Sequence, residues 1–181
     1  SGQGVKCIDI SADFRIRDLD VYSEWYEVEH PAPKLIEESV YGLPEIYREH
    51  ISASSIVANP GCYPTASILG LAPALRAGII DNNVIIDAKS GDSGAGRGLS
   101  LKTHYSEVNE NVSAYGLDGH RHMPEIAQEL SEAAGEEVKV TFVPHLIPMT
   151  RGILATSYAS ISEEFLESEK DVGDSINEIY R

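Results

Sequence analysis

Cysteine is scarce in this sequence, with only Cys7 and Cys62 among 181 residues. Two cysteines far apart in a chain of this length do not make the disulfide framework that stabilises small secreted domains. The reducing cytosol is therefore the expected compartment, and we predict a cytoplasmic protein.

Positive charge and long apolar runs are also in short supply. Lys and Arg number 14 against 29 Asp and Glu, which gives a formal net charge of −15 at pH 7. So acidic a chain is a poor ligand for nucleic-acid phosphates and for anionic membranes. No apolar run approaches the roughly 20 residues that a helix needs to cross a bilayer, and no signal peptide is visible. We therefore expect a small-molecule substrate and neither a nucleic-acid nor a membrane partner.

The most informative stretch surrounds Cys62. Residues 55–58 are apolar and β-branched, as in a short buried strand. Asn59-Pro60-Gly61 then predicts a turn, because Pro fixes φ and Gly accepts positive φ. A helical pattern follows, with Pro64 at the first helical position and Gly78 at the C-terminal stop. Cys62 is thus expected where the N–H groups of a helix N-terminus favour the nucleophilic thiolate over the thiol.

Local chemistry leaves a second interpretation of Cys62 open, because most free cysteines in intracellular domains are small core residues. The sequence of residues 59–66 adds evidence for a catalytic Cys62. Asn59-Pro60-Gly61-Cys62-Tyr63-Pro64-Thr65-Ala66 resembles the active-site signature of the N-acetyl-γ-glutamyl-phosphate reductase family. That family is related to aspartate-semialdehyde dehydrogenase and, more distantly, to glyceraldehyde-3-phosphate dehydrogenase. The resemblance implies that Cys62 is the nucleophile and places Asn59 among the substrate-binding residues.

An earlier segment also resembles this family. Residues 5–10 are predicted to form a buried strand in which Cys7 is a core residue. The string Asp9-Ile10-Ser11-Ala12-Asp13-Phe14-Arg15 resembles a family segment at the carboxyl end of a strand in the nucleotide domain, where doubly wound sheets bind ligands. The resemblance implies that Ser11 and Arg15 face substrate; a polar loop without a ligand is the alternative.

A glycine-rich loop follows the strand predicted over residues 83–88. Its glycines and serines can present backbone N–H groups to an anion, and a flexible crossover is the alternative. The loop is no Walker motif, since no Gly-Lys-Thr/Ser opens a helix after it. It is similar to the family's Ser-Gly-x-Ser-Gly-Ala-Gly loop, which implies a place beside the nicotinamide end of the cofactor and the phosphoryl site. The cofactor-binding positions predicted from this resemblance are Ser90, Gly91, Ser93 and Gly94.

The segment His120-Arg121-His122 admits three interpretations. A metal pair is disfavoured, because alternate spacing with an intervening Arg and no nearby Cys or carboxylate cluster is poor zinc chemistry; we predict no metal. A solvated loop is the second interpretation. The third is acid/base catalysis, since an imidazole near a thiol can take its proton and later protonate an alkoxide. The family carries its catalytic histidine in a similar His-Arg-His-x-Pro-Glu-Ile segment. This resemblance assigns the role to His120, with His122 as the second candidate and Arg121 as a substrate-binding residue.

Two further strands are predicted over residues 137–143 and 153–161. The link between them resembles the family's His-Leu-x-Pro-Met-x-Arg-Gly segment. This resemblance places His145 beside the site and Arg151 among the substrate-binding residues. A position in the subunit interface is the equal alternative for Arg151.

The predicted fold class is α+β. It comprises a glyceraldehyde-3-phosphate dehydrogenase-like catalytic domain, with a mixed, largely antiparallel sheet and helices against one face, plus the C-terminal end of an incomplete Rossmann α/β domain. We place the boundary between residues 1–61 and 62–181. The expected helices lie around residues 22–26, 46–51, 64–78, 124–135 and, interrupted at Gly173, 165–180. The chain starts at Ser1 without Met and lacks a Gly-x-Gly-x-x-Gly/Ala unit, so we expect a piece of a longer protein that is inactive by itself.

The resemblance implies NADPH-dependent reduction of N-acetyl-γ-glutamyl phosphate to N-acetylglutamate semialdehyde in arginine biosynthesis, through a thioester on Cys62. NADP(H) is the implied cofactor, and a dimer or tetramer is the implied state of the full-length protein. Three alternatives stay open. The first alternative is a related semialdehyde dehydrogenase of the lysine-pathway or aspartate type. The second is a Cys–His hydrolase that needs no nucleotide, and the third is a non-catalytic assembly module.

Overall fold

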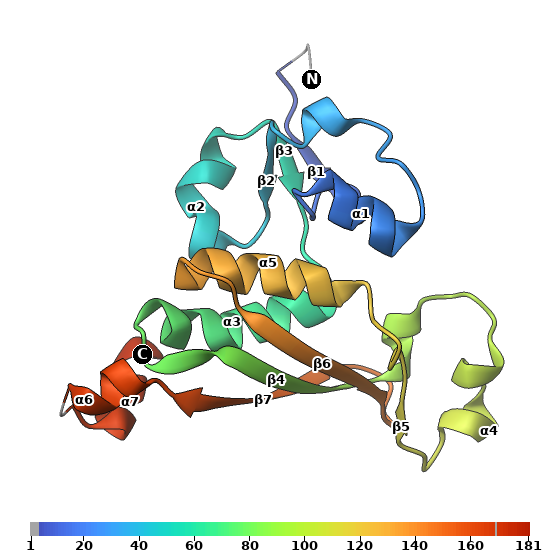
Figure 1. Ribbon diagram of the computed structural model, residues 1–181. Coiled ribbons are helices and arrows are strands. Elements are labelled where there is room, and N and C mark those ends of the chain that lie inside the picture. Colours follow the sequence, from blue (N-terminus) through green and yellow to red (C-terminus); the bar gives the residue numbers. More distant parts are fainter. Residues whose placement is uncertain (1–3, 169) are drawn as a thin grey trace. The chain divides into compact units, whose positions relative to one another are not determined.

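The computed structural model describes residues 4–168 and 170–181. The chain forms two compact units, an N-terminal unit (Ser1–Thr65) and a C-terminal unit (Ala66–Arg181). Helix α3 (Cys62–Arg76) begins in the first unit and has most of its length in the second. Figure 1 shows the elements of both units along the chain.

The N-terminal unit contains a three-stranded parallel sheet in the order β1-β3-β2. Its strands are β1 (Cys7–Asp9), β2 (Ser39–Tyr41) and β3 (Ile56–Ala58), and all three residues of the central strand β3 are buried. A parallel arrangement buried at its centre is typical of α/β sheets with helical crossovers.

The helices of this unit form where sequence signals predict them. In α1 (Leu19–Tyr26), the Asp18 side chain caps the N-terminus by accepting hydrogen bonds from the N–H groups of Asp20 and Val21. Helix α2 (Pro44–Ala53) opens with Pro at its first position. A 3-10 turn, η1 (Pro33–Leu35), lies between them.

Cys7 is exposed, and its predicted place in the core is wrong. In the described part of the chain β1 is an edge strand, with β3 on one side only. The apolar run predicts the strand correctly, but sequence periodicity does not say how many neighbours cover it.

The C-terminal unit is built on a mixed sheet in the order β5-β6-β4-β7. Strand β4 (Ile80–Ser90) pairs parallel with β6 (Lys139–Leu146) and antiparallel with β7 (Ile153–Ile161), and the short β5 (Ser113–Ala114) pairs antiparallel with β6. Helix α5 (His122–Ala134) and the C-terminal-unit part of α3 lie against one face of this sheet (Figure 1). The predicted α+β class, with a mixed sheet and helices against one face, is confirmed.

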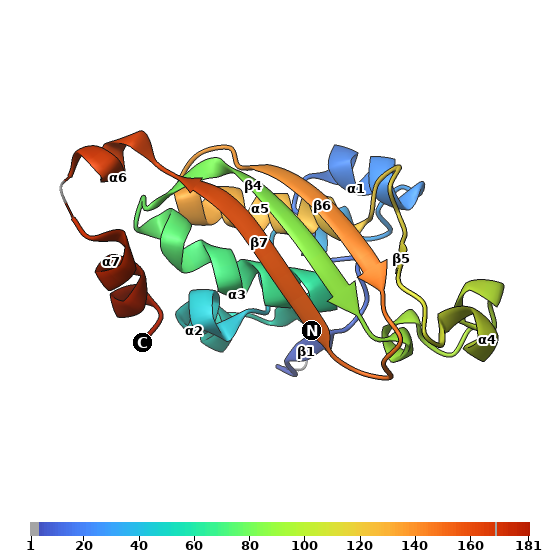
Figure 2. The same cartoon turned by 90° about the horizontal axis from the view of Figure 1, so that it is seen from below.

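Alternation along β4 separates the two faces of the sheet. Val84, Ile86 and Ala88 are buried on the helix-covered face, whereas Ile85 between them is exposed. Figure 2 views the sheet from the opposite side, where no helix of the described C-terminal unit crosses strands β4, β6 and β7. We call this side the open face.

Several element boundaries differ from the predicted ones. Helix α3 begins at Cys62, so Pro64 is its third residue; the predicted stop at Gly78 is confirmed, with φ of 64°. The helix predicted over residues 165–180 is two helices, α6 (Glu163–Glu167) and α7 (Val172–Ile179). The break precedes Asp171, which caps α7 by accepting from the N–H of Asp174, and Gly173 lies inside α7. The remaining short elements are η2 (Asp92–Ala95), η3 (Leu101–Thr103) and α4 (Tyr105–Val108).

Candidate active site

Cys62 lies at the strand–turn–helix junction predicted for it. Strand β3 ends at Ala58, residues 59–61 form the turn, and Cys62 is the first residue of α3 and is exposed. Thr65 closes the first turn, since both its N–H (3.0 Å) and its hydroxyl (2.8 Å) donate to the Gly61 carbonyl. The positive end of the helix dipole favours negative charge at this position. The thiol is therefore accessible and lies at the N-terminal end of a helix.

The other predicted site residues of the N-terminal unit hydrogen-bond to groups of the protein itself. The Arg15 Nε donates to the Asn59 carbonyl (2.7 Å), and the Asn59 amide donates to the Pro60 carbonyl (3.2 Å). The Ser11 hydroxyl donates to the Asp9 carboxylate (2.8 Å). All three predicted substrate-binding residues thus lie at the carboxyl ends of β1 and β3, and their substrate contacts stay predictions.

The predicted cofactor loop of the C-terminal unit packs tightly against the link between β6 and β7. A Cβ added to Gly91 would lie 2.7 Å from the Arg151 nitrogen and 2.8 Å from the Met149 carbonyl oxygen, so this backbone approach requires glycine. Residues 91–93 donate backbone hydrogen bonds to the carbonyls of Gly152, Met149 and Thr150 (3.0–3.1 Å). The structure therefore brings the loop of residues 90–94 and the exposed Arg151 together at one edge of the sheet.

These backbone contacts remove the anion cradle that the glycine-rich pattern predicts. The N–H groups of Gly94 and Gly96 also donate to carbonyls within the loop, as those of residues 91–93 do to the link. The Ser90 side chain is buried and donates to the Gly91 carbonyl (2.8 Å). Ser93 is exposed and is the residue of this set whose hydroxyl faces solvent. Residues 90–94 therefore offer a phosphate few donors.

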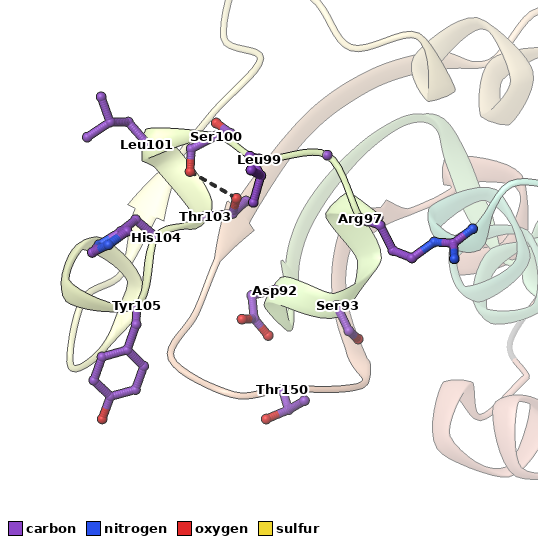
Figure 3. Close-up of a pocket in the computed structure, with 12 residues that line it drawn as sticks. Asp92, Ser93, Arg97, Leu99, Ser100, Leu101, Thr103, His104, Tyr105 and Thr150 are labelled. Atoms are coloured by element: carbon purple, nitrogen blue, oxygen red, sulfur yellow. Dashed lines mark hydrogen bonds between the residues drawn. The ribbon is translucent and has the colours of Figure 1, made fainter.

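Next to Ser93 the surface is hollowed into an open groove of about 720 Å³. Figure 3 shows Asp92, Ser93 and Thr150 on one side of it and Leu99 and Thr103 on another, while the Arg97 side chain extends away from Asp92 and Thr150. Hydroxyl groups dominate the polar lining: Ser93, Ser100, Thr103, Tyr105 and Thr150. Such hydroxyl groups can both donate hydrogen bonds to a polar ligand and accept them from it. Residues 97–105 have no periodic pattern, and for that reason sequence reasoning missed them.

His120 lies in an aromatic pocket just before α5. Its ring makes edge-on contacts with the rings of Tyr115, His122 and Phe142, at centroid distances of 5.7, 4.8 and 5.4 Å. Its Nδ1 accepts a hydrogen bond from the backbone N–H of His122 (3.1 Å). In the neutral ring this acceptor role assigns the proton to Nε2.

The charge state of His120 follows from its surroundings. Burial, and second the positive charge of Arg121, lower the pKa of His120 from 6.5 to about 4. At neutral pH the ring is therefore uncharged and carries its proton on Nε2. His122, the second candidate, is buried as the first residue of α5, and Arg121 is exposed.

The titration of His120 is directly measurable. We expect its imidazole resonances to show a pKa near 4, and Arg121→Gln to raise that value part of the way, since burial is the larger cause. Because the folded state then binds fewer protons than the unfolded state between about pH 4 and 6.5, this group makes stability rise with pH in that window and leaves it unchanged above. NMR titration with His120→Asn as the assignment control tests this; an ordinary value near 6.5 would contradict it.

His145 lies on the open face of the sheet. It pairs with Lys89 in the register of β4 and β6, and its Nδ1 is 3.1 Å from the Asp87 carboxylate, which also contacts the Lys89 ammonium.

Among the described residues no group of three or more His, Cys, Asp or Glu side chains is arranged to hold a metal ion. No helix in the described part of the chain has the length and apolar character needed to span a membrane.

The N-terminal unit thus presents an exposed thiol at a helix N-terminus, and the C-terminal unit carries a neutral histidine before α5. A family model described as semialdehyde dehydrogenase, dimerisation domain, matches residues 62–181. The chain therefore belongs to the semialdehyde dehydrogenase family.

Curated relatives agree with the resemblance in the motifs. The chain is 58% identical over 163 residues to the N-acetyl-gamma-glutamyl-phosphate reductase of Symbiobacterium thermophilum, covering 89% of this chain and 47% of that protein. It is 55% identical over 179 residues to the protein of the same name from Pelotomaculum thermopropionicum, covering 98% and 50%. The resemblance to the N-acetyl-γ-glutamyl-phosphate reductase family is thus confirmed, and the chain spans about half the length of the curated relatives it matches.

The fold also resembles a solved structure. The crystal structure of aspartate semialdehyde dehydrogenase II from Vibrio cholerae matches with a TM-score of 0.60 at 16% identity, over 94% of this chain and 52% of that one. At this identity the likeness concerns the fold alone, and it supports the α+β assignment.

Proposed function

We propose that the full-length protein reduces N-acetyl-γ-glutamyl phosphate to N-acetylglutamate semialdehyde with NADPH, in cytoplasmic arginine biosynthesis. The observation that supports this most is the exposed Cys62 thiol at the N-terminus of α3. Relatives named for this activity share more than half of their residues with the chain over the aligned region. Residues 1–61 are proposed to be the end of the dinucleotide domain, and residues 62–181 to carry the catalytic part.

The first half of the reaction forms a thioester. The Cys62 thiolate attacks the acyl carbon, the bond from that carbon to the phosphate oxygen breaks, and inorganic phosphate leaves with the electron pair. The helix N-terminus that stabilises the thiolate also offers N–H groups near the negative oxygen of the tetrahedral intermediate. A thiolate suits this task because it is both a nucleophile and, later, a leaving group.

The second half releases the aldehyde. A bound nicotinamide cofactor would supply the hydride that reduces the thioester carbonyl. Ser93, which lines the groove, and the next residue, Gly94, are proposed to hold its nicotinamide end. The Nε2–H of His120 donates its proton to the resulting oxyanion, and the neutral ring becomes an imidazolate until the proton returns. As that proton returns to the ring, the carbon–sulfur bond breaks and Cys62 leaves as the thiolate.

A burst experiment tests this function. Full-length protein mixed with the acyl phosphate but no NADPH is expected to release about one phosphate per Cys62 and to gain the acyl mass on the Cys62 peptide. NADPH should then discharge the acyl group as aldehyde. Continuous phosphate release without NADPH would instead support the hydrolase alternative, and no release would support the non-catalytic module.

The open face of the C-terminal unit is proposed to be the contact between two copies of the chain. It carries exposed apolar side chains on adjacent strands: Ile85 (47% exposed) pairs with Tyr158 (55%), and Leu154 (63%) pairs with Lys89. Exposed apolar patches of this kind mark interaction sites, and the matched family model is described as a dimerisation domain. These two observations favour a second copy as the occupant.

Leu154→Asp is expected to weaken self-association of the full-length protein by at least about 10- to 100-fold, because burying a polar group without a partner costs about 1–3 kcal/mol and burying a charged group costs more. Sedimentation equilibrium measures the dissociation constant. Leu166→Asp is the matched control, since Leu166 on α6 is similarly exposed (61%) but lies off the sheet. An unchanged constant in both Leu154→Asp and Tyr158→Asp would rule out this face.

A further inference from the structure

Arg15 is a charged residue that the N-terminal unit buries, with only 9% of its surface exposed. Its guanidinium donates two hydrogen bonds to backbone carbonyls, from Nε to Asn59 (2.7 Å) and from Nη2 to Ile10 (3.2 Å). A buried guanidinium is costly unless its donors are satisfied, so its place here depends on these carbonyls.

The two carbonyls lie just beyond the ends of neighbouring strands. The ladder between β1 and β3 ends at the pair Asp9 and Ala58, after which the Asn59 N–H still donates to the Asp9 carbonyl (2.8 Å). Pro60 has no N–H, so the ladder cannot continue through the turn. At this point the rigid guanidinium bridges the segments that follow β1 and β3. It thereby links the carbonyl of Asn59, three residues before Cys62, to the end of β1.

Arg15 is itself held by an ordered loop. Asp13, two residues earlier, accepts the Tyr22 hydroxyl on its carboxylate (3.0 Å) and the His30 Nε2–H on its backbone carbonyl (2.7 Å). The His30 Nδ1 accepts the Ala32 N–H (3.1 Å), which fixes the tautomer that donates from Nε2. Burial, and second the hydrogen bond to Asp13, raise the pKa of Tyr22 to about 12, so the phenol remains a donor. The loop that presents Arg15 is therefore cross-linked by buried polar contacts.

We infer that Arg15 is a positioning residue for the nucleophile, which holds the turn of residues 59–61 and thereby aims Cys62, and that it is not a substrate ligand. This inference rests on the proposed role of Cys62. It replaces the substrate contact that the sequence resemblance implies for Arg15, because the Nε and Nη2 donors of this buried side chain bind the protein's own backbone.

The two roles predict different kinetics for Arg15→Met in the full-length protein, since Met keeps the apolar stem and removes every donor. A positioning role lowers kcat about 10- to 100-fold with KM within a factor of two, because misplaced reacting groups slow the chemical step. It also slows the displacement of iodide from iodoacetamide by the Cys62 thiolate to a similar degree. A substrate ligand would raise KM and leave the labelling rate of Cys62 unchanged.

Internal and matched controls separate a local effect from unfolding. Cys7 is exposed, so its labelling rate in the same sample should stay constant. Arg48→Met removes an exposed arginine on α2 and should change neither rate nor KM. In Arg15→Lys the ammonium can reach one carbonyl at most. Its kcat and its Cys62 labelling rate should therefore lie between those of wild type and Arg15→Met. Tyr22→Phe removes one hydrogen bond to Asp13 and keeps the ring. It should show a smaller loss of kcat and of Cys62 labelling rate, and it replaces Arg15→Met as the test variant if Arg15→Met does not fold.

Slower Cys62 labelling and lower kcat at constant KM support the inference. A raised KM with normal labelling, or normal behaviour of Arg15→Met and Tyr22→Phe while Cys62→Ser is inactive, overturns the inference alone. Full activity of Cys62→Ser overturns the proposed function and the inference together.

Discussion

Replacing Cys62 with serine is expected to lower the turnover of acyl phosphate and NADPH by a factor on the order of 10⁴ or more in the full-length protein. The reason is chemical at both steps. A serine hydroxyl is not ionised at neutral pH and is a far weaker nucleophile than a cysteine thiolate. An oxygen ester also resists hydride and its alkoxide is a poorer leaving group than a thiolate. The loss of NADPH absorbance with time measures the effect.

Cys7→Ser is the matched control for this substitution. Cys7 is also an exposed thiol, but it lies on the edge strand β1 and not at a helix N-terminus. Its replacement should change turnover by less than a factor of two, and iodoacetamide should label Cys62 roughly tenfold faster than Cys7 at neutral pH. Turnover in Cys62→Ser within tenfold of wild type would show that the thiol is not the nucleophile.

The features that sequence predicts well are those that depend on neighbouring residues. The strand, turn and helix around Cys62 follow from a short apolar run, Asn59-Pro60-Gly61 and a helical pattern, and the structure has them in that order. The stop of α5 at Gly135, with φ of 77°, is equally local. Even here the helix starts two residues earlier than Pro64 suggests, since Pro is tolerated anywhere in the first turn where N–H groups have no intrahelical acceptor.

The features that sequence misses depend on residues far apart in the chain. From sequence, Arg15 is a polar loop residue. In the structure its guanidinium donates to the Asn59 carbonyl, 44 positions away. From sequence, the N–H groups after Ser90 are candidates for binding an anion. In the structure, carbonyl groups of residues 149–152 accept their hydrogen bonds. In both cases local pattern identifies the donor, but only the fold identifies the acceptor. The exposure of Cys7 is missed for the same reason, since burial is set by neighbouring strands.

His120→Asn is expected to lower kcat by roughly 10²–10⁴-fold and to leave NADPH affinity nearly unchanged, as is typical when a general acid is removed. The Nδ1 of His120 accepts from the His122 N–H, so the proton of the neutral ring lies on Nε2, and this is the proton that the proposed acid step uses. Single-turnover mixing of the acyl-enzyme with NADPH isolates this step, because thioester formation is complete beforehand. His122→Asn is the neighbouring control: a large loss there and a small one in His120→Asn would move the role to His122, and no loss in either would remove acid catalysis from this segment.

His120→Gln separates proton transfer from hydrogen bonding alone. A glutamine amide can place an N–H near the position of the imidazole Nε2–H, but it cannot give its proton away. If the neutral ring of His120 only donates a hydrogen bond to the oxyanion, His120→Gln should recover much of the rate lost in His120→Asn. Because burial and Arg121 keep the ring neutral and its pKa near 4, the Nε2–H is a weak acid at pH 7, and transfer requires the strongly basic alkoxide formed on the thioester carbon. We therefore expect His120→Gln to be as slow as His120→Asn, and a recovery of more than tenfold would assign His120 the role of an oxyanion donor instead.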